Sequence, residues 1–314
     1  MSLNKIFDVV ALGEAMVEFN QTRAGEPTYL QGFGGDTSNA VIAAARAGAR
    51  TAYLTRLGED AFGQSLRQLW GDEGVDCGGI ETDALAPTGI YFVSHGPTGH
   101  EFSYLRAGSA ASRMDPAWLA RGPAAILNTC RILHVSGISL AISPTACDTA
   151  FAAMHQTRSA GAQVSFDSNL RLKLWPLDRA RACIQHAMAL CDIFLPSLDD
   201  MTTLTGLTDP AAIVDWAHRG GARQVALKLG GDGALISDGQ SQEHLPAHPV
   251  TVVDATGAGD CFCGNLLARM AQGDSIFQAA RHANAAAALS VQGFGAVAPL
   301  PRAEAVQALL CTPW

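Results

Sequence analysis

Val250-Thr251-Val252-Val253-Asp254-Ala255-Thr256-Gly257-Ala258-Gly259-Asp260 is the stretch of the chain that decides the predicted fold. The β-branched residues 250–253 indicate a strand, and residues 258–272 have the pattern of a helix. Gly257 and Gly259 lie between these two elements, and a turn without Cβ atoms can approach an anion closely. The free N–H groups of the first helical turn and the helix dipole would stabilise the same anion. The stretch therefore predicts a phosphate site between a strand and a helix.

Asp260, at the end of this turn, has two interpretations. A carboxylate repels a neighbouring phosphate, so a turn that only bound phosphate would avoid it. Asp260 is explained if it accepts a proton from a hydroxyl that attacks the phosphate. It is equally well explained as a helix cap, and the local chemistry leaves both interpretations open. No P-loop motif and no dinucleotide-binding glycine motif occurs in the chain.

The rest of the chain alternates between strand-like and helical patterns, which is typical of a parallel sheet covered by helices on both faces. We expect strands at 8–12, 52–57, 132–136, 163–167, 193–196 and 224–229, and helices at 37–47, 62–73, 144–160, 177–190, 258–272, 276–290 and 302–310.

Two regions, at about 16–30 and 78–104, break this alternation with short segments of period two and no helix between them. They predict antiparallel ribbons that form a small sheet over the main domain, either as a lid over an active site or as edge decoration. Residues 1–314 are expected to form a single α/β domain with these lid segments inserted in it.

Composition excludes several classes of protein. The 314 residues carry a formal charge of −8, which argues against a nucleic-acid partner. No apolar run reaches the roughly 18 residues of a membrane span, and the first residues lack the apolar core of a signal peptide, so we expect no membrane partner and a cytoplasmic location. The eight cysteines include no C-x-x-C pair and are expected to be mostly small buried apolar residues.

A second glycine motif, Gly34-Gly35-Asp36-Thr37-Ser38-Asn39, lies near the start of the chain. Together with the stretch 254–260 it resembles the two signatures of the ribokinase-like (PfkB-type) carbohydrate kinases, and the resemblance covers essentially the whole chain. Ala255 and Asn265 depart from the family pattern. The resemblance implies a ribokinase-like three-layer sandwich, with a central mostly parallel sheet and a small β-sheet lid. It also implies that ATP and Mg²⁺ are used.

The same resemblance implies roles for individual residues. Asp260 would be the catalytic base, and Gly257, Ala258 and Gly259 would form an anion hole. The pair Ser197 and Asp200 replaces the family's Asn-x-x-Glu, where Ser197 could equally be a helix cap. Residues implied in ATP binding are Ser197, Lys228, Gly230, Gly233, Gly257, Gly259, His282 and Asn284. Residues implied in binding a monovalent cation such as K⁺ are Asp254 and Thr256, although capping explains Asp254 as well.

The acceptor side of the site is expected around the first glycine motif. Residues 102–111 and 166–175 look like segments of 2-keto-3-deoxygluconate kinases and contribute Arg106 and Arg171. Arginine can bind a carboxylate through two hydrogen bonds, which suits a sugar acid, whereas structural ion pairs are the alternative. The full set of expected substrate-binding residues is Glu14, Gly34, Gly35, Asp36, Asn39, Tyr91, Tyr104, Arg106, Arg171 and Asp260.

We therefore hypothesise transfer of the ATP γ-phosphoryl group to a primary hydroxyl of a small sugar acid, chiefly 2-keto-3-deoxygluconate. The alternatives are a kinase of a neutral sugar such as ribose or fructose, a nucleoside kinase, and a non-catalytic sugar or nucleotide sensor on a kinase fold. Lid strands with apolar outer faces could pair between two subunits, so a lid-mediated homodimer is also expected.

Overall fold

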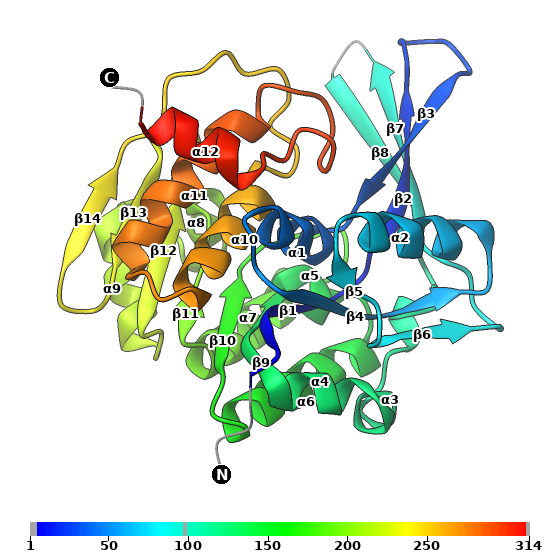
Figure 1. The fold of residues 1–314 in the computed structure, drawn as a ribbon, viewed down its shortest axis with the longest axis horizontal. Coiled ribbons are helices and arrows are strands. Elements are labelled where there is room, and N and C mark those ends of the chain that lie inside the picture. The colour runs from blue at the N-terminus through cyan, green and yellow to red at the C-terminus, as the bar shows by residue number, and fades with distance from the viewer. Residues whose placement is uncertain (1–4, 97–98, 312–314) are drawn as a thin grey trace.

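The computed structural model describes residues 5–96 and 99–311. The described residues leave out 1–4 and 312–314 of the predicted domain and 97–98 of the second predicted lid segment. A large sheet lies between two layers of helices, and a smaller sheet projects from one end of it (Figure 1). This arrangement confirms the predicted three-layer sandwich.

The large sheet follows the order β14-β13-β12-β11-β10-β9-β1-β4-β5, and β6 pairs with β4 outside this path. Its strands from β12 to β6 are parallel, and β13 and β14 extend it as an antiparallel hairpin. The strands are β1 (Phe7–Leu12), β4 (Thr51–Gly58), β5 (Val75–Asp76), β6 (Ile80–Asp83), β9 (Cys130–Ser136), β10 (Gln163–Asp167), β11 (Ile193–Phe194), β12 (Gln224–Lys228), β13 (Ala234–Ser237) and β14 (Gln242–Leu245). All six expected strands of this sheet are present.

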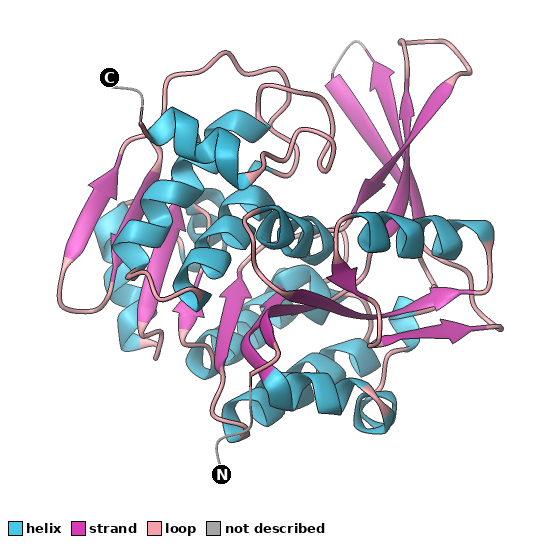
Figure 2. Ribbon diagram, in the orientation of Figure 1, coloured by secondary structure: helices cyan, strands magenta, loops and turns pink. Residues whose placement is uncertain are grey.

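Helices cover both faces of the sheet (Figure 2). One face packs against α1 (Asp36–Arg46), α10 (Ala258–Ala271) and α11 (Ile276–Ser290), and the other against α6 (Pro144–Ser159), α7 (Leu177–Leu190) and α9 (Pro210–Arg219). The remaining helices are α2 (Ala61–Asp72), α3 (Pro116–Arg121), α4 (Pro123–Thr129), α5 (Gly137–Ala141), α8 (Leu198–Thr205) and α12 (Ala303–Leu310), with short 3₁₀ turns η1 (Ala111–Arg113) and η2 (Gly230–Asp232).

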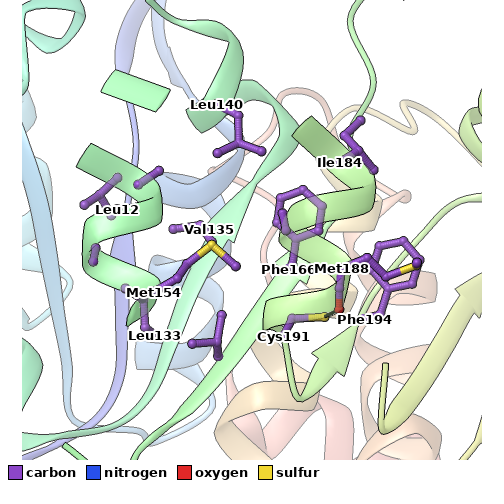
Figure 3. Close-up of a cluster of buried hydrophobic side chains, with 14 of the residues drawn as sticks. Leu12, Leu133, Val135, Leu140, Met154, Phe166, Ile184, Met188, Cys191 and Phe194 are labelled. Carbon is purple, nitrogen blue, oxygen red and sulfur yellow. Dashed lines mark hydrogen bonds between the residues drawn. The ribbon is translucent and has the colours of Figure 1, made fainter. Parts of the chain in front are cut away.

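The strand sequences explain why both faces are covered. Val9 of β1 packs in the core beneath α1 and α10, whereas its neighbour Val10 packs in the core on the opposite face. Successive residues of a strand point to opposite faces, so a continuous apolar run requires two apolar partners. Leu12 belongs to the second core, with Phe166 and Phe194 of the adjacent strands β10 and β11 (Figure 3).

The small sheet, called the lid here, has the order β3-β2-β7-β8, with β2 (Met16–Gln21), β3 (Tyr29–Gly34), β7 (Ile90–Gly96) and β8 (Gly99–Leu105). The prediction of purely antiparallel ribbons is wrong at its centre, because β2 and β7 pair in parallel. Each of these two strands has an antiparallel partner on its outer side: β3 pairs with β2, and β8 pairs with β7. Residues 80–83, expected in the lid, form β6 and extend β4 of the main sheet instead.

The strand expected at 250–253 is absent. Val252 and Val253 are 61% and 44% exposed, and the N–H of Val253 donates to the carbonyl of Val291 in a loop. β-Branched residues favour a strand only where a partner strand and a covering layer exist, and neither is available here. In the described part of the chain, no helix is long and apolar enough to cross a membrane.

Candidate active site

The two glycine motifs meet at the facing N-termini of α1 and α10. The side-chain amide of Asn39, in α1, donates to Oδ2 of Asp260, in α10, at 2.8 Å. The helices can approach this closely because Gly264 of α10 faces the backbone of α1: a Cβ atom there would lie 2.1 Å from the carbonyl oxygen of Ala40. The structure therefore brings the predicted base and the first motif together.

The turn before α10 has the geometry of an anion site. Gly257 has φ 76° and lies tightly against Ala296, so it must be glycine. The N–H of Ala258 donates to the carbonyl of Ala255 at 3.2 Å, whereas in the described part of the chain no carbonyl accepts from Gly257 or Gly259. The position of a Cβ atom at Gly259 would be 3.5 Å from Nζ of Lys228. An anion would thus find amides, a helix dipole and a cation together.

A chain of buried polar groups links the acceptor side to this cation. Asp36 accepts from the side-chain amide of Asn169 at 2.6 Å, and the backbone N–H of Asn169 donates to Asp167 at 3.2 Å. Asp167 forms an ion pair with Lys228 at 2.7 Å. Asn169 has φ 22°, a conformation that asparagine tolerates better than most residues. These bonds fix the ends of β10 and β12 relative to the start of α1.

The electrostatics of the cluster suit proton transfer. Burial raises the pKa of Asp260 to about 8, and the Asp36 and Asp167 carboxylates add to the rise, whereas the Asn39 hydrogen bond and Lys228 oppose it. Burial would lower the pKa of Lys228, but the charge and hydrogen bond of Asp167, together with Cys263 and Asp260, outweigh it, and the pKa lies above its usual range. A base with a pKa near neutrality is well matched to general-base catalysis.

Glu14 and Arg106 form a buried ion pair beside this cluster. The hydroxyl of Ser109 donates to the other oxygen of Glu14 at 2.5 Å. Arg106 therefore already has a carboxylate partner within the protein. Arg171 differs: its guanidinium is exposed, donates to the carbonyl of Leu170 at 2.9 Å, and pairs with no carboxylate in the residues that the structure describes.

The lid contributes two tyrosines. The hydroxyl of Tyr91 donates to Glu18 at 2.5 Å, and its ring stacks on that of the half-exposed Tyr104 at 5.6 Å. A Cβ atom at Gly34 would collide with Tyr91, and Gly35 has φ 118° and lies against the backbone of residue 14. Both glycines are thus required where β3 passes into α1.

The residues expected at the ATP site are more dispersed. Ser197 caps α8 and accepts from the N–H of Asp200, whose carboxylate accepts from Ser168 at 2.8 Å. Gly230 and Gly233 have φ 61° and 90° in the turn after β12, and a Cβ atom at Gly233 would meet the carbonyl of residue 245 at 2.0 Å. The turn that follows Lys228 therefore needs both glycines.

Asn284 and His282 lie in different surroundings along α11. The side chain of Asn284 donates to the carbonyl of Pro246 at 2.6 Å, after β14. His282 instead lines a cavity of about 500 Å³ with Arg269 of α10 and Glu304 of α12. Two positions on a helix that are two residues apart point about 200° apart. The structure therefore does not bring both side chains onto one adenine wall.

Asp254 holds the turn to a second loop. Its Oδ1 accepts from the N–H and the hydroxyl of Thr256 at 2.9 and 2.7 Å, and its Oδ2 accepts from the N–H of Gly295 at 2.9 Å. These bonds are the capping role considered for Asp254. Among the described residues, no group of three or more His, Cys, Asp or Glu side chains could hold a metal ion.

Sequence reasoning missed Asp167, Asn169 and Ser109 as members of the site. All three lie within four residues of an arginine that it did select, at 106 or 171, in segments quoted for their resemblance. The signal that could have identified them is their position: Asp167 ends a buried parallel strand, where polar side chains gather at the carboxyl edge of the sheet.

A glycine-rich turn with free backbone amides beside a lysine, a buried carboxylate of raised pKa and a cluster of polar side chains near a small lid sheet are together typical of a kinase of small molecules. The profile of the "pfkB family carbohydrate kinase" matches residues 7–303. The chain belongs to this family and is a sugar kinase.

Individual relatives carry two different names. The chain is 34% identical over 312 residues to the 2-dehydro-3-deoxygluconokinase of Bacillus subtilis, covering 96% of this chain and 95% of that protein. It is also 34% identical over 311 residues to Fructokinase-1 of rice, Oryza sativa, covering 93% and 94%. The solved structure of Vibrio cholerae fructokinase with fructose, ADP and a calcium ion matches with a TM-score of 0.85 at 30% identity, covering 99% and 100%.

Proposed function

We propose that the protein transfers the γ-phosphoryl group of ATP to a primary hydroxyl of a sugar acid, chiefly 2-keto-3-deoxygluconate (2-dehydro-3-deoxygluconate). The observation that carries this proposal is Arg171. Its exposed guanidinium lies two residues after Asn169, which binds Asp36, and no described carboxylate pairs with it. An acceptor with a carboxylate would supply the missing anion. A relative named for this activity, at 34% identity, supports the choice.

In the proposed reaction, Asp260 takes the proton of the acceptor hydroxyl as its oxygen bonds to the γ-phosphorus and the bond to ADP breaks. Asn39 holds the carboxylate of Asp260 in place through its amide, and Asp36 fixes the acceptor. The amides of Gly257 and Gly259 stabilise the charge on the transferred group. Lid closure would exclude water, which would otherwise compete as the acceptor.

ATP and a divalent metal fit the residues that are present. The open approach at Gly259 and the nearby ammonium of Lys228 suit a phosphate. Mg²⁺ would offset the charge of the ATP phosphates. Asp200 and Ser197 would hold it through water, because Asp200 is bonded to Ser168 and Ser197 caps α8.

A K⁺ site at Asp254 and Thr256 remains a proposal that a comparison of rates in K⁺ and Na⁺ buffers would test.

A neutral sugar such as fructose is the second candidate. The observation that favours it is the Glu14–Arg106 pair, which neutralises the more buried arginine without any ligand. Because of this pair, replacing Arg106 would leave Glu14 buried and unpaired, and the resulting loss of stability would obscure any change in specificity. Arg171 is the cleaner position for a test.

The test is an ADP-release assay over a panel of sugars and sugar acids. Arg171→Ala should lower kcat/KM for 2-keto-3-deoxygluconate by about 10–100-fold, the value of charge-assisted hydrogen bonds, and leave neutral sugars unaffected. Lys173→Ala removes a nearby exposed cation and is the matched control. Equal activity of Arg171→Ala and the wild type on the acid would refute the sugar-acid assignment.

A second variant tests catalysis itself. Asp260→Asn should reduce turnover by about 10²–10⁴-fold, the usual contribution of a positioned base. Near-normal turnover by this variant would exclude Asp260 as the base. Absence of turnover by the wild type on every sugar of the panel would instead favour a sensor.

The homodimer is also proposed through the lid. Leu30, Phe102 and Leu105 on its outer strands are 66%, 38% and 58% exposed. Apolar side chains on unpaired edge strands favour association with another sheet. A Leu30→Lys, Leu105→Lys variant should shift the mass measured by light scattering from dimer to monomer, and a wild-type monomer at micromolar concentration would contradict the proposal.

A further inference from the structure

Arg46 lies at the C-terminal end of α1, about three helical turns from Asp36 and about two from Asn39. Only 11% of its side chain is exposed. Its Nε and Nη2 atoms donate to both oxygens of Glu73, at 2.9 and 2.6 Å. Its Nη1 donates to the carbonyls of Val297 and Leu300, at 3.1 and 2.5 Å. Nη1 also lies 3.5 Å from the carbonyl oxygen of Ala298, so three of the five hydrogen bonds of the guanidinium are to one backbone segment.

That segment, residues 295–300, supports the anion turn. The N–H of Gly295 donates to Asp254. Ala296 packs so closely against Gly257 that a Cβ atom on Gly257 would lie 3.0 Å from the Ala296 carbonyl oxygen. Ala296, Val297 and Leu300 are buried. The turn therefore rests on the segment at two points, and Arg46 fixes the segment from behind.

We propose that Arg46 is a positioning residue for phosphoryl transfer. By holding residues 297–300 to the end of α1, it sets where Gly257 and the start of α10 lie relative to the acceptor residues at the beginning of α1. One helix then carries the acceptor contacts at one end and the attachment of the phosphate turn at the other. The proposal rests on the proposed roles of Asp260 and the 257–259 amides.

Glu73 assists but does not perform this task. It terminates α2 and pairs with both Arg46 and Arg302, and the Arg46 hydrogen bonds hold the pKa of its carboxyl below the usual range. The ionised carboxylate of Glu73 has no proton to donate to the carbonyls of 297–300, whereas Arg46 bonds to them directly through Nη1. Removing the charge of Glu73 should affect stability more than catalysis.

The experiment measures kcat and both KM values per folded enzyme for Arg46→Met, Arg46→Lys and Glu73→Gln. Arg46→Met should lower kcat about 10–100-fold, the effect of a misplacement of about 1 Å, with both KM values changed less than about threefold. Arg46→Lys should fall between, because one ammonium cannot reproduce the guanidinium fork. Glu73→Gln should keep kcat within about twofold of the wild type.

Arg158→Met is the matched control. Arg158 also bonds to a carbonyl, that of Leu190, and to a carboxylate, that of Asp192. These contacts lie just before β11, at the end of the sheet away from the candidate site. The Arg158→Met variant should lose stability and keep the kcat of the wild type. If Arg46→Met does not fold, the Lys variant carries the test.

Normal kcat in the folded Arg46 variants would overturn the proposal, as would an equal loss in Glu73→Gln. Failure of the proposed function can be told apart from failure of the Arg46 proposal. If the proposed function is wrong, Asp260→Asn will retain turnover whatever the Arg46 variants do.

Discussion

Replacing Asp260 with Asn should make the ligand-free protein more stable, and the gain should grow with pH. The pKa of Asp260 rises from the ordinary 3.8 to about 8 on folding. Between these values the folded state binds a proton that the unfolded state has released, so the wild type loses stability as pH rises from 4 to 8. An uncharged side chain removes this dependence.

The size of the effect follows from the same shift. Each pKa unit corresponds to about 1.4 kcal/mol, so the full shift sets a ceiling of about 6 kcal/mol. Asp260 is partly accessible, and solvent screening reduces the effect, so we expect a gain of about 2–3 kcal/mol at pH 8.5 and almost none at pH 4. The amide oxygen of the variant can still accept from Asn39.

Urea unfolding of both proteins at intervals from pH 4 to 9, without nucleotide or sugar, measures the difference. Asp199→Asn, at an exposed position of α8, is the control for general charge effects. A difference in free energy of unfolding that does not change with pH would refute the reasoning.

In the wild type, kcat/KM should rise tenfold per pH unit and level off near pH 8, since the base must be ionised.

Three further variants test the packing of the site. Gly264→Ala places a Cβ atom 2.1 Å from the Ala40 carbonyl oxygen and should cost about 1–3 kcal/mol, which a constant urea midpoint would contradict. Lys228→Met leaves Asp167 buried and unpaired and should cost about 3–5 kcal/mol; adding Asp167→Asn should restore part of this, and strict additivity would disprove the coupling. Gly35→Ala should lower the melting temperature, because φ 118° strains any other residue, and an unchanged value would show that the backbone relaxes.

The fold was largely predictable because its main elements are local patterns. Apolar runs such as 163–167 are β-rich and short, and they became central strands. The run at 250–253 is richer still in β-branched residues but has no partner strand, so composition alone misassigned it. The lid boundary at 80–83 failed for a related reason: alternation predicts a strand, but it does not say which sheet the strand joins.

The candidate site was predictable only in part. The glycine motifs identify Asp260 and Asn39 because their residue types carry the chemistry. The Glu14–Arg106 pair and the Asn169–Asp36 bond join residues 92 and 133 positions apart, and no local pattern reports such distances. The different surroundings of His282 and Asn284 likewise depend on how α11 is rotated against its neighbours.

The division of the chain between acceptor and phosphate groups has a consequence for engineering. Most of the candidate acceptor residues, from Glu14 to Arg106, precede the strand β9, whereas the candidate nucleotide residues all follow α7. A chimera that exchanges the first 110 or so residues, with the short segment after β10, would transplant sugar choice onto an unchanged phosphoryl-transfer half. Such modularity would let one catalytic scaffold be adapted to new substrates by recombination rather than by the gradual redesign of a single pocket.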